Sequence, residues 1–280
     1  MGKQAILVTG ASTGIGYATA HLLAQNGYAV FAGVRTEDDA SRLAAAHPNV
    51  TPITLDVTKA ADIRTAAALV RESGIPLYGL VNNAGVAVAG PLEFLPLDDI
   101  RKQFEINVYG PIAIAQAMLP MLRERGGRIA FIGSIAGRIS APFVGPYSAS
   151  KAALASLVDA MRQELAGFGI AVSLFEFAAV KTPIWSKGRT AKDALIAKLP
   201  AAAIEHYGPF IEAIVAQTER EERHGMEPGA VAEAVLGALR SERPRERYVI
   251  GKQAKLQAMV AMLPPSTRDR LIKKAMQLPD

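Results

Sequence analysis

The sequence predicts an α/β protein with a doubly wound, mostly parallel seven-stranded sheet and helices on both faces. Short β-rich runs alternate with longer helical patterns along the chain. The runs are almost continuously apolar, as parallel strands covered on both faces are. A glycine-rich turn joins the first run to the first helical pattern. From the length and this single alternation we expect one domain spanning residues 1–280.

Seven apolar runs are the predicted strands. They lie at residues 5–10, 29–34, 51–57, 77–83, 128–133, 170–177 and 247–251. Helical patterns cover residues 14–26, 60–72, 98–124 and 148–166. Residues 183–230 contain Ala-rich pieces and a charged run but no convincing strand, so we expect a helical insertion before the last strand.

The composition excludes several kinds of site. The chain has 280 residues, half of them hydrophobic, and no cysteine. Disulfides, thiolate zinc sites and a cysteine nucleophile are therefore excluded. The first residues run directly into a strand pattern, and no apolar run reaches the roughly 18 residues of a membrane span. We expect a cytoplasmic protein.

The positive charge is concentrated at the C-terminal end. The net charge is +5, yet residues 240–280 alone hold ten Lys/Arg against four Asp/Glu. Tyr248 is the only aromatic residue of that stretch, whereas nucleic-acid binding favours interleaved aromatics, so we expect no nucleic-acid partner. The basic amphipathic extension at 252–280 leaves four roles open: a solvated helix, closure of the active site, a subunit interface, or, as a minor alternative, contact with an anionic membrane surface.

A glycine-rich turn follows the first strand and opens a helix. Gly10, Gly14 and Gly16 stand in "TGASTGIG". Glycine is needed where a chain turns sharply and where backbone approaches a pyrophosphate, and the following helix points free N–H groups at the phosphates. A ligand-free strand–helix turn is the alternative, but the position at the first strand favours a dinucleotide site. The remaining predicted contacts of this turn are Ser12, Thr13 and Ile15.

The end of the second strand indicates which dinucleotide is bound. Arg35 follows the strand directly, and an arginine pairs well with a ribose 2′-phosphate. This favours NADP(H), with NAD(H) as the second choice. Glu37, Asp38 and Asp39 favour NAD(H) instead, because an acid at this position often binds the ribose 2′-hydroxyl. Acids also suit the first turn of a helix, which is our preferred interpretation of these three.

Further polar motifs follow later strands. They are "NNAG" at 82–85, Ser134 in "GSIAG", and "YSASK", which holds Tyr147 and Lys151. Ligands of open α/β sheets bind beyond the carboxyl ends of the strands, so these motifs converge on one crevice.

In combination, these motifs resemble the short-chain dehydrogenase/reductase family over residues 4–182. The resemblance implies a Rossmann fold with Asn107, Ser134, Tyr147 and Lys151 as the catalytic set. The second strand and the C-terminal tail are similar to the hydroxysteroid and retinol dehydrogenase branch. We also expect a homodimer or homotetramer. Cofactor contacts come from Asp56, Val57, Asn83, Ala84, Gly85, Tyr147, Lys151, Val180 and Thr182, with Asp56 at the adenine amine.

The chemistry of Tyr147 and Lys151 agrees with the catalytic role that the resemblance implies. A free tyrosine has a pKa near 10, and Lys151 lies one helical turn from Tyr147. A cation about 4 Å away, at an effective dielectric of about 20, is worth roughly 4 kcal/mol, or about three pKa units. We therefore expect Lys151, helped by the charge of an oxidised nicotinamide, to bring the phenol near pH 7. Ser134 holds the substrate oxygen, Tyr147 passes the proton, and Lys151 also grips the nicotinamide ribose.

Asn107 stands four residues before Pro111 in a helical pattern. Proline cannot donate to the carbonyl of Asn107, so we expect a kink that leaves this acceptor free. In the resembled family that carbonyl holds a water linking the lysine to solvent. An ordinary proline kink with a polar passenger is the alternative.

The sequence departs from the family after the sixth strand. Phe177 and Ala178 replace the usual Pro-Gly, and we expect Phe177 to face the substrate. Residues 183–230 should form an apolar lid with Trp185, facing Phe143 and Val144. Apolar walls predict an apolar substrate. The four histidines show no metal spacing, so no metal is expected.

The predicted function is NAD(P)(H)-dependent interconversion of a hydrophobic secondary alcohol and its ketone, of steroid-like, retinoid-like or aryl/alkyl type. An NAD-dependent alcohol dehydrogenase or an acyl ketoreductase is the alternative among enzymes. A non-catalytic nicotinamide-cofactor-binding sensor or scaffold is the alternative of another class. The complete catalytic set argues against the sensor, which needs no phenolate.

Overall fold

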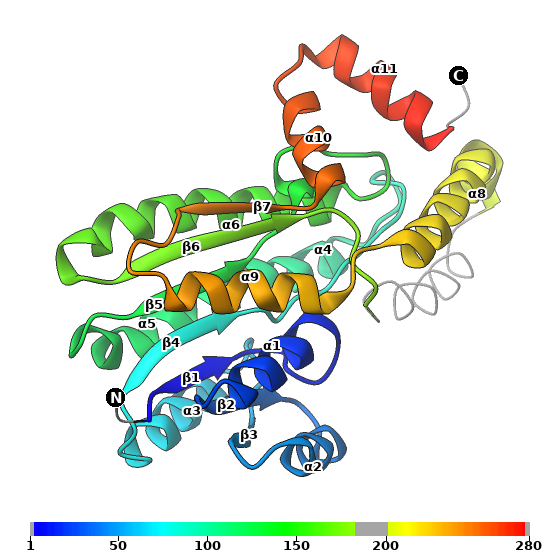
Figure 1. Ribbon diagram of the computed structural model, residues 1–280. Helices are drawn as coiled ribbons and strands as arrows, with labels where there is room; N and C mark the ends of the chain where they lie inside the picture. Colours follow the sequence, from blue (N-terminus) through cyan, green and yellow to red (C-terminus); the bar gives the residue numbers. More distant parts are fainter. Residues whose placement is uncertain (1–2, 183–200, 278–280) are drawn as a thin grey trace.

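The computed structural model describes residues 3–182 and 201–277, and its centre is a seven-stranded sheet (Figure 1). The strand order is β3-β2-β1-β4-β5-β6-β7, and each neighbouring pair is parallel. This order confirms the doubly wound α/β prediction, and all seven predicted strands are present. The strands are β1 Ala5–Val8, β2 Ala29–Val34, β3 Val50–Thr54, β4 Leu77–Asn82, β5 Arg128–Ile132, β6 Ala171–Phe177 and β7 Arg247–Ile250.

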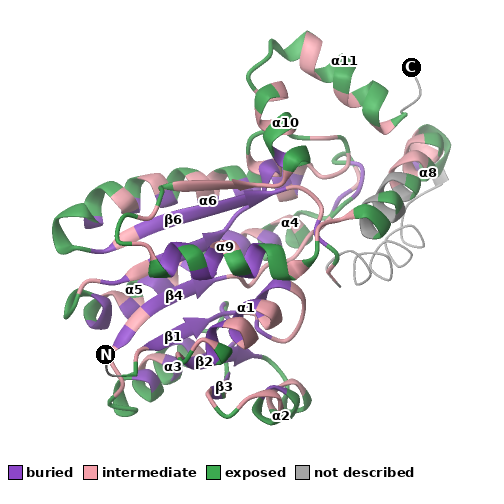
Figure 2. Ribbon diagram, viewed as in Figure 1, coloured by how far each residue is buried: buried purple, intermediate pink, exposed green. Residues whose placement is uncertain are grey.

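Helices cover both faces of the sheet, and its inner strands β1, β2, β4, β5 and β6 are almost entirely buried, whereas the edge strands β3 and β7 are less so (Figure 2). One face packs against α1 Gly14–Gln25, α2 Glu37–Ala46 and α9 Pro228–Arg240. The other packs against α3 Ala60–Glu72, α5 Gly110–Arg123 and α6 Gly145–Leu165. The sheet therefore lies between two separate apolar clusters. Its carboxyl edge is where a ligand site is expected in a sheet of this type.

The long helical pattern at 98–124 is interrupted. It consists of α4 Leu97–Phe104, a π-helical turn η1 Glu105–Tyr109, and α5. Gly110 donates its N–H to the carbonyl of Glu105, five residues back. Pro111 follows in the first turn of α5, where a missing N–H is tolerated. The expected irregularity is confirmed and takes the form of a π turn; the free carbonyl of Asn107 stays a prediction.

The acids after the second strand begin a helix, as preferred from the sequence. Thr36 caps α2 by accepting the N–H of Asp39 at 3.3 Å. Glu37, Asp38 and Asp39 lie in the first turn, where negative charge is favourable.

Three C-terminal helices gather beyond the carboxyl edge (Figure 1). They are α8 Ala201–His224, α10 Lys252–Val260 and α11 Pro265–Met276. The predicted helical insertion is therefore helical over 201–224, and residues 183–200, including Trp185, lie outside the described residues. Among the described helices, none is long and apolar enough to cross a membrane.

Candidate active site

A cavity of about 1010 Å³ opens at the carboxyl edge of the sheet. It brings together most of the residues that the sequence analysis named. These are Gly10, Ser12, Thr13, Gly14, Ile15, Arg35, Asp56, Val57, Asn83, Ala84, Gly85, Ser134, Val144, Tyr147, Lys151, Phe177, Val180 and Thr182. Gly16, Asn107 and Phe143 are not part of its lining.

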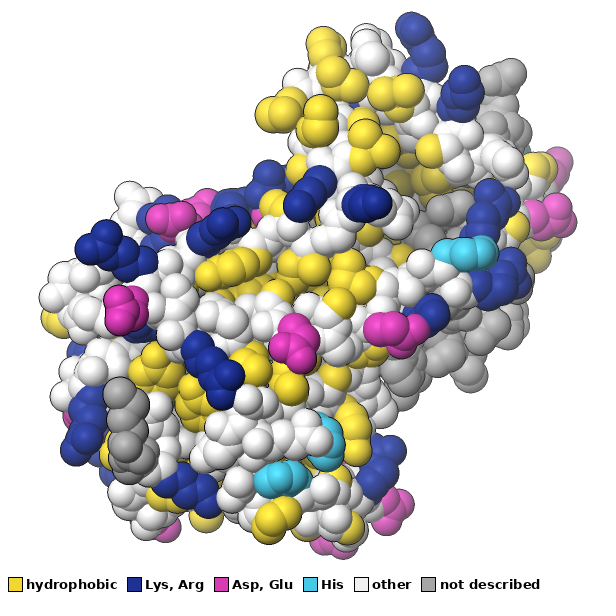
Figure 3. Space-filling view, viewed as in Figure 1, with side chains coloured by type: hydrophobic (Ala, Val, Ile, Leu, Met, Phe, Trp, Pro, Cys, Tyr) yellow, Lys and Arg dark blue, Asp and Glu magenta, His cyan; other side chains and the backbone are white. Residues whose placement is uncertain are grey.

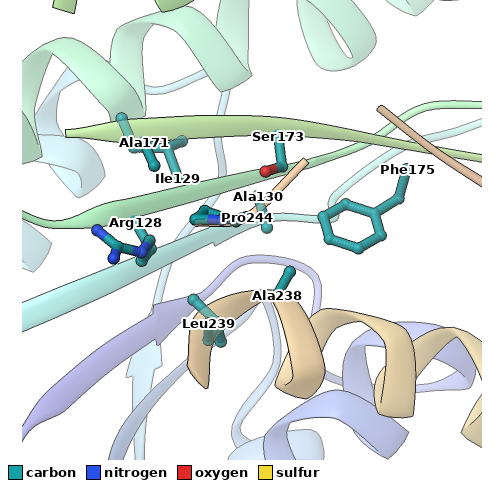
Figure 4. A pocket seen from close by; sticks show the side chains of 9 residues that line it. All are labelled: Arg128, Ile129, Ala130, Ala171, Ser173, Phe175, Ala238, Leu239 and Pro244. Carbon is teal, nitrogen blue, oxygen red and sulfur yellow. The ribbon is translucent and has the colours of Figure 1, made fainter. Parts of the chain in front are cut away.

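A second, much smaller cavity lies between β5, β6 and α9 (Figure 4). Its volume is about 10 Å³, room for about one water molecule. Arg128, Ser173 and Leu239 border it. Of these two cavities, the large one has space for a dinucleotide and a substrate.

The glycine-rich turn is shaped for a ligand by backbone geometry. Gly10 and Gly14 have φ of +64° and +57°, values that favour glycine. A Cβ on Gly16 would lie 2.2 Å from the carbonyl oxygen of Gly10. Thr13, the N-cap residue of α1, makes no side-chain capping bond. The first N–H groups of the helix, which begins at the cavity wall, are therefore not occupied by this side chain and can bind a ligand. This cradle fits the pyrophosphate of a dinucleotide.

Asn83 supports the turn from the neighbouring strand. Its Nδ2 donates to the carbonyls of Thr9 and Gly10 at 2.9 and 3.0 Å. The Thr9 hydroxyl in turn accepts the N–H groups of Asn83 and Ala84, both at 3.0 Å. Sequence reasoning missed Thr9, although its place directly before Gly10 was a usable signal. These bonds lock the two loops that hold the cofactor end of the cavity.

The side chain of Asn107 has a role that the sequence analysis did not assign. Asn107 is fully buried in η1. Its Oδ1 accepts the N–H of Val86, and its Nδ2 donates to the carbonyl of Val86, both at 2.9 Å. The Nδ2 also donates to Ser150 Oγ at 3.0 Å, and Ser150 donates to the carbonyl of Tyr147 at 2.7 Å. Asn107 thus joins the loop after Gly85 to the catalytic helix α6.

Ser134, Tyr147 and Lys151 meet at the centre of the cavity. Ser134 begins the 3₁₀ turn η2 Ile135–Gly137 and makes a side-chain hydrogen bond with Tyr147. Lys151 Nζ donates to the carbonyl of Ile132 at 2.8 Å. The same Nζ lies 5.9 Å from the centre of the Tyr147 ring. The predicted juxtaposition of phenol and amine is therefore present.

The predicted lowering of the phenol pKa by Lys151 is wrong for the protein's own groups. Burial raises the pKa of Tyr147 above its ordinary value, and the bond with Ser134 opposes this only in part. Burial also lowers the pKa of Lys151 to about 8. Burial disfavours the charged form of each group, and the Lys151 ammonium donates to the carbonyl of Ile132. At neutral pH, the Tyr147 phenol of this structure is therefore protonated.

Two arginines approach the other end of the cavity. Arg35 is exposed there, as predicted. Arg42 of α2 reaches back to the glycine-rich turn, donating to the carbonyl of Ser12 at 2.5 Å and to Asp39 at 2.7 Å. Sequence reasoning missed Arg42, because nothing local shows that its helix packs beside the turn.

Asp56 lies at this end of the cavity as an ionised carboxylate. Its Oδ1 accepts the N–H and the hydroxyl of Thr58 at 3.0 and 2.7 Å. Burial favours the protonated form, but these bonds and the charges of Lys59 and Arg35 together lower the pKa of Asp56. An ionised acceptor at the cavity wall suits the predicted contact with an amine.

The aromatic residues expected around the substrate lie in two places. Phe143, with φ of +67°, packs against Tyr207 and Phe210 of α8, with ring centres 5.8 and 6.4 Å apart. Its neighbour Val144 lines the cavity instead. Phe177 is 7% exposed and packs in the apolar cluster under α9, at the edge of the cavity.

The C-terminal extension forms a wall of the cavity. Its cavity-lining residues are Gln253, Leu256, Gln257, Val260, Leu271, Ile272, Ala275 and Met276. Leu256 and Met259 of α10 and Met262 after it are exposed, and Figure 3 shows hydrophobic side chains gathered in the region of α10 and α11. Of the four roles left open by the sequence, this placement favours closure of the site. Among the residues that the structure covers, no cluster of His, Asp or Glu is arranged to hold a metal ion.

A Rossmann-type sheet with these groups at its carboxyl edge defines a nucleotide-binding oxidoreductase. The family profile described as short chain dehydrogenase matches residues 4–193. An NADPH-dependent 3-dehydrocapnine reductase from Ornithobacterium rhinotracheale is 31% identical, over 96% of this chain and 95% of that protein. Retinol dehydrogenase 5 of Homo sapiens is 34% identical, over 95% of this chain and 87% of that protein.

Similarity extends to solved structures. A short-chain dehydrogenase from Streptomyces avermitilis has a TM-score of 0.79 and 30% identity, covering 98% of this chain and 97% of that one. The chain belongs to the short-chain dehydrogenase/reductase family, in its hydroxysteroid- and retinol-dehydrogenase-like branch. The resemblance seen in the sequence is thereby confirmed.

Proposed function

We propose that the protein is an NADP(H)-preferring oxidoreductase that interconverts a hydrophobic secondary alcohol and its ketone. The observation that carries the proposal is the meeting of Ser134, Tyr147 and Lys151 inside an apolar-walled cavity that has a dinucleotide cradle at its other end. A bound nicotinamide dinucleotide supplies or accepts the hydride.

The chain's own residues handle the oxygen and the proton. In the direction of reduction, Ser134 and Tyr147 donate hydrogen bonds to the ketone oxygen, where negative charge develops. Tyr147 then gives its proton to that oxygen, and the product is the secondary alcohol. Lys151 holds positive charge beside the phenol, which stabilises the phenolate left behind. Burial raises the pKa of Tyr147, a direction that suits its proposed role as proton donor in the reduction.

Arg35 and Arg42 support the preference for NADP(H). Arg35 is free to face a 2′-phosphate, and Arg42 stands beside the Ser12 carbonyl. A relative whose name records NADPH dependence agrees with this assignment. A retinol dehydrogenase among the relatives, together with the leucine, isoleucine and methionine wall of α10 and α11, supports an apolar alcohol or ketone.

Tyr147→Phe tests the function against a non-catalytic sensor. Turnover of a panel of aliphatic, aromatic and steroid ketones is measured with NADPH and with NADH. We expect turnover by the wild type, loss of at least about 100-fold in kcat for the variant, and an unchanged Kd for NADPH. Tyr109→Phe, an exposed site in η1, is the matched control and should keep full activity.

Two outcomes would overturn the proposal. A wild type that binds NADPH but reduces no ketone and oxidises no secondary alcohol of the panel is a sensor. A Tyr147→Phe variant that keeps its activity excludes the proton transfer assigned here.

A further inference from the structure

A glutamate lies buried near the carboxyl end of β6. Glu176 is 1% exposed, between Phe175 and Phe177 in a strand that is otherwise mainly apolar. Burying a carboxylate costs several kcal/mol unless charged partners surround it. The proposed reaction makes no direct use of this group, so its partners show what it does for the fold or the site.

Arg138 and Arg247 are those partners. Arg138 binds Glu176 in a fork, with Nε donating to Oε1 at 2.8 Å and Nη2 to Oε2. Arg247 of β7 donates to the same Oε1 at 3.5 Å and also binds Asp159 of α6. Two arginines therefore balance two carboxylates across η2, β6, β7 and α6. The fork is the stronger link, because paired charge-assisted bonds fix direction as well as distance.

Arg138 comes directly after the turn that carries Ser134. At the start of this turn, Gly133 donates its N–H to the carbonyl of Phe175 at 2.8 Å. At its end, Arg138 is held by the next residue of β6, Glu176. Ser134 thus lies in a short loop whose two ends are fixed to consecutive residues of one strand.

The other side of the turn packs closely against helix α6. A Cβ on Gly137 would lie 3.0 Å from the carbonyl carbon and oxygen of Lys151. The turn therefore has no free space toward α6, and the fork with Glu176 holds it from the β6 side. Helix α10 also lies close to both β6 and η2.

We propose that Glu176, acting through Arg138, is a positioning residue that holds the hydroxyl of Ser134 against Tyr147. This inference rests on the proposed function, since it concerns the same oxygen-binding pair. Ser134 and Tyr147 must meet one substrate oxygen together, and a displacement of about 1 Å is enough to cost about 100-fold in rate. The cofactor cradle lies on other loops and does not depend on the fork.

Glu176→Gln tests this assignment, because it keeps the shape but removes the charge of the fork. We expect kcat for ketone reduction to fall about 10- to 100-fold. KM and Kd for NADPH should stay within about twofold, since the cradle is untouched. Hydrogen exchange should become faster in the peptide covering residues 133–139. Arg138→Lys, at a position 31% exposed on its side chain, keeps the charge without the fork and should act in the same direction.

The control breaks an arginine–carboxylate pair on the surface. Asp98→Asn removes the exposed pair with Arg101 and should leave kcat and the exchange of residues 133–139 unchanged. If the two residues act through each other, the Glu176→Gln/Arg138→Lys double variant should be little slower than the worse single variant.

Each result decides the matter. If both single variants keep kcat within about twofold of wild type, or lose NADPH binding in parallel with kcat, the positioning role is overturned. A lower Tm with unchanged kcat assigns Glu176 to stability alone. If the wild type itself turns over no substrate, the proposed function fails. The exchange of residues 133–139 then still reports whether the fork orders the turn.

Discussion

Lys151, one of the residues proposed as catalytic, lies in an environment that disfavours its charge. It is 6% exposed, and its ammonium has one carbonyl partner, that of Ile132. Burial lowers its pKa from 10.5 to about 8, which corresponds to a penalty of roughly 3 kcal/mol for carrying the charge at neutral pH. The protein therefore accepts a loss of stability at the residue that its chemistry needs.

Lys151→Met should reveal that penalty through its pH dependence. Between pH 8 and 10.5 the unfolded chain binds the proton more tightly than the folded chain, so wild-type stability falls as the pH drops through this window. The Lys151→Met variant has no buried amine to protonate, so it does not lose stability in this way as the pH drops. We expect its stability relative to wild type to be roughly 2–3 kcal/mol greater at pH 7 than at pH 10.

Urea unfolding at the two pH values measures this difference. The lost bond to Ile132 adds an offset that is the same at both pH values and cancels. Lys3→Met, at an exposed lysine, is the control and should show no such difference. A relative stability of Lys151→Met that does not change with pH contradicts the buried charge.

For single residues, the sequence predicted which side chains form the site better than it predicted their burial and their hydrogen-bond partners. The spacing of Tyr147 and Lys151 put them together, because i and i+4 share a helix face. Spacing says nothing of burial, so the direction of the Tyr147 pKa was wrong. Hydrogen bonds between segments that are distant in the sequence were missed. They are made by the side chains of Thr9, Asn107 and Arg42, and no local sequence pattern indicates them.

Among the elements, the C-terminal helices had the role that the sequence left most open. Residues 252–280 had four open roles because an amphipathic basic helix suits solvent, membrane and protein partners alike. The structure puts α10 and α11 along the cavity, with α11 in contact with α8. Only tertiary packing decides this, since the apolar face of a helix does not name what it covers.

Deletion of residues 264–280, which removes α11, should weaken substrate binding alone. Leu271, Ile272 and Met276 leave the cavity wall, so apolar ketones lose burial worth roughly 25 cal/mol per Å². We expect KM for the largest apolar ketone of the panel to rise at least about tenfold, and Kd for NADPH to stay the same. Steady-state kinetics against substrates of increasing size measures the effect.

The size series also serves as the control. Small ketones reach Tyr147 without touching α11, so their KM should change little. An equal rise in KM for small and large ketones, or a weaker Kd for NADPH, would show that α11 supports the whole site instead of its apolar wall.

For the whole molecule, the fold could be predicted because its signals are local and repeated. Each strand is a short apolar run, each helix a periodic one, and right-handed parallel connections leave few arrangements. The carboxyl edge then follows from topology, and the cofactor motifs with it. The exceptions occur where two elements meet: the Asn107 side chain, which joins the loop after Gly85 to α6, and Phe143, whose ring packs against α8 and does not line the cavity.

Cofactor choice is a property of the whole molecule that stability measures directly. A ligand that binds only the folded state stabilises it by RT ln(1 + [L]/Kd), about 2.7 kcal/mol at a hundredfold excess over Kd. For a chain of this length that corresponds to roughly 5 °C in Tm. We expect NADPH to raise Tm by about this amount, and NADH at equal concentration to raise it much less.

Arg35→Ala separates the phosphate from the rest of the dinucleotide. The guanidinium contributes only toward a 2′-phosphate, so the variant should lose most of the NADPH shift and keep that of NADH. The two cofactors should then stabilise it about equally, whatever the substrate. A larger shift with NADH than with NADPH in the wild type would assign the protein to NAD(H), with Glu37, Asp38 or Asp39 as the ribose partner in place of Arg35.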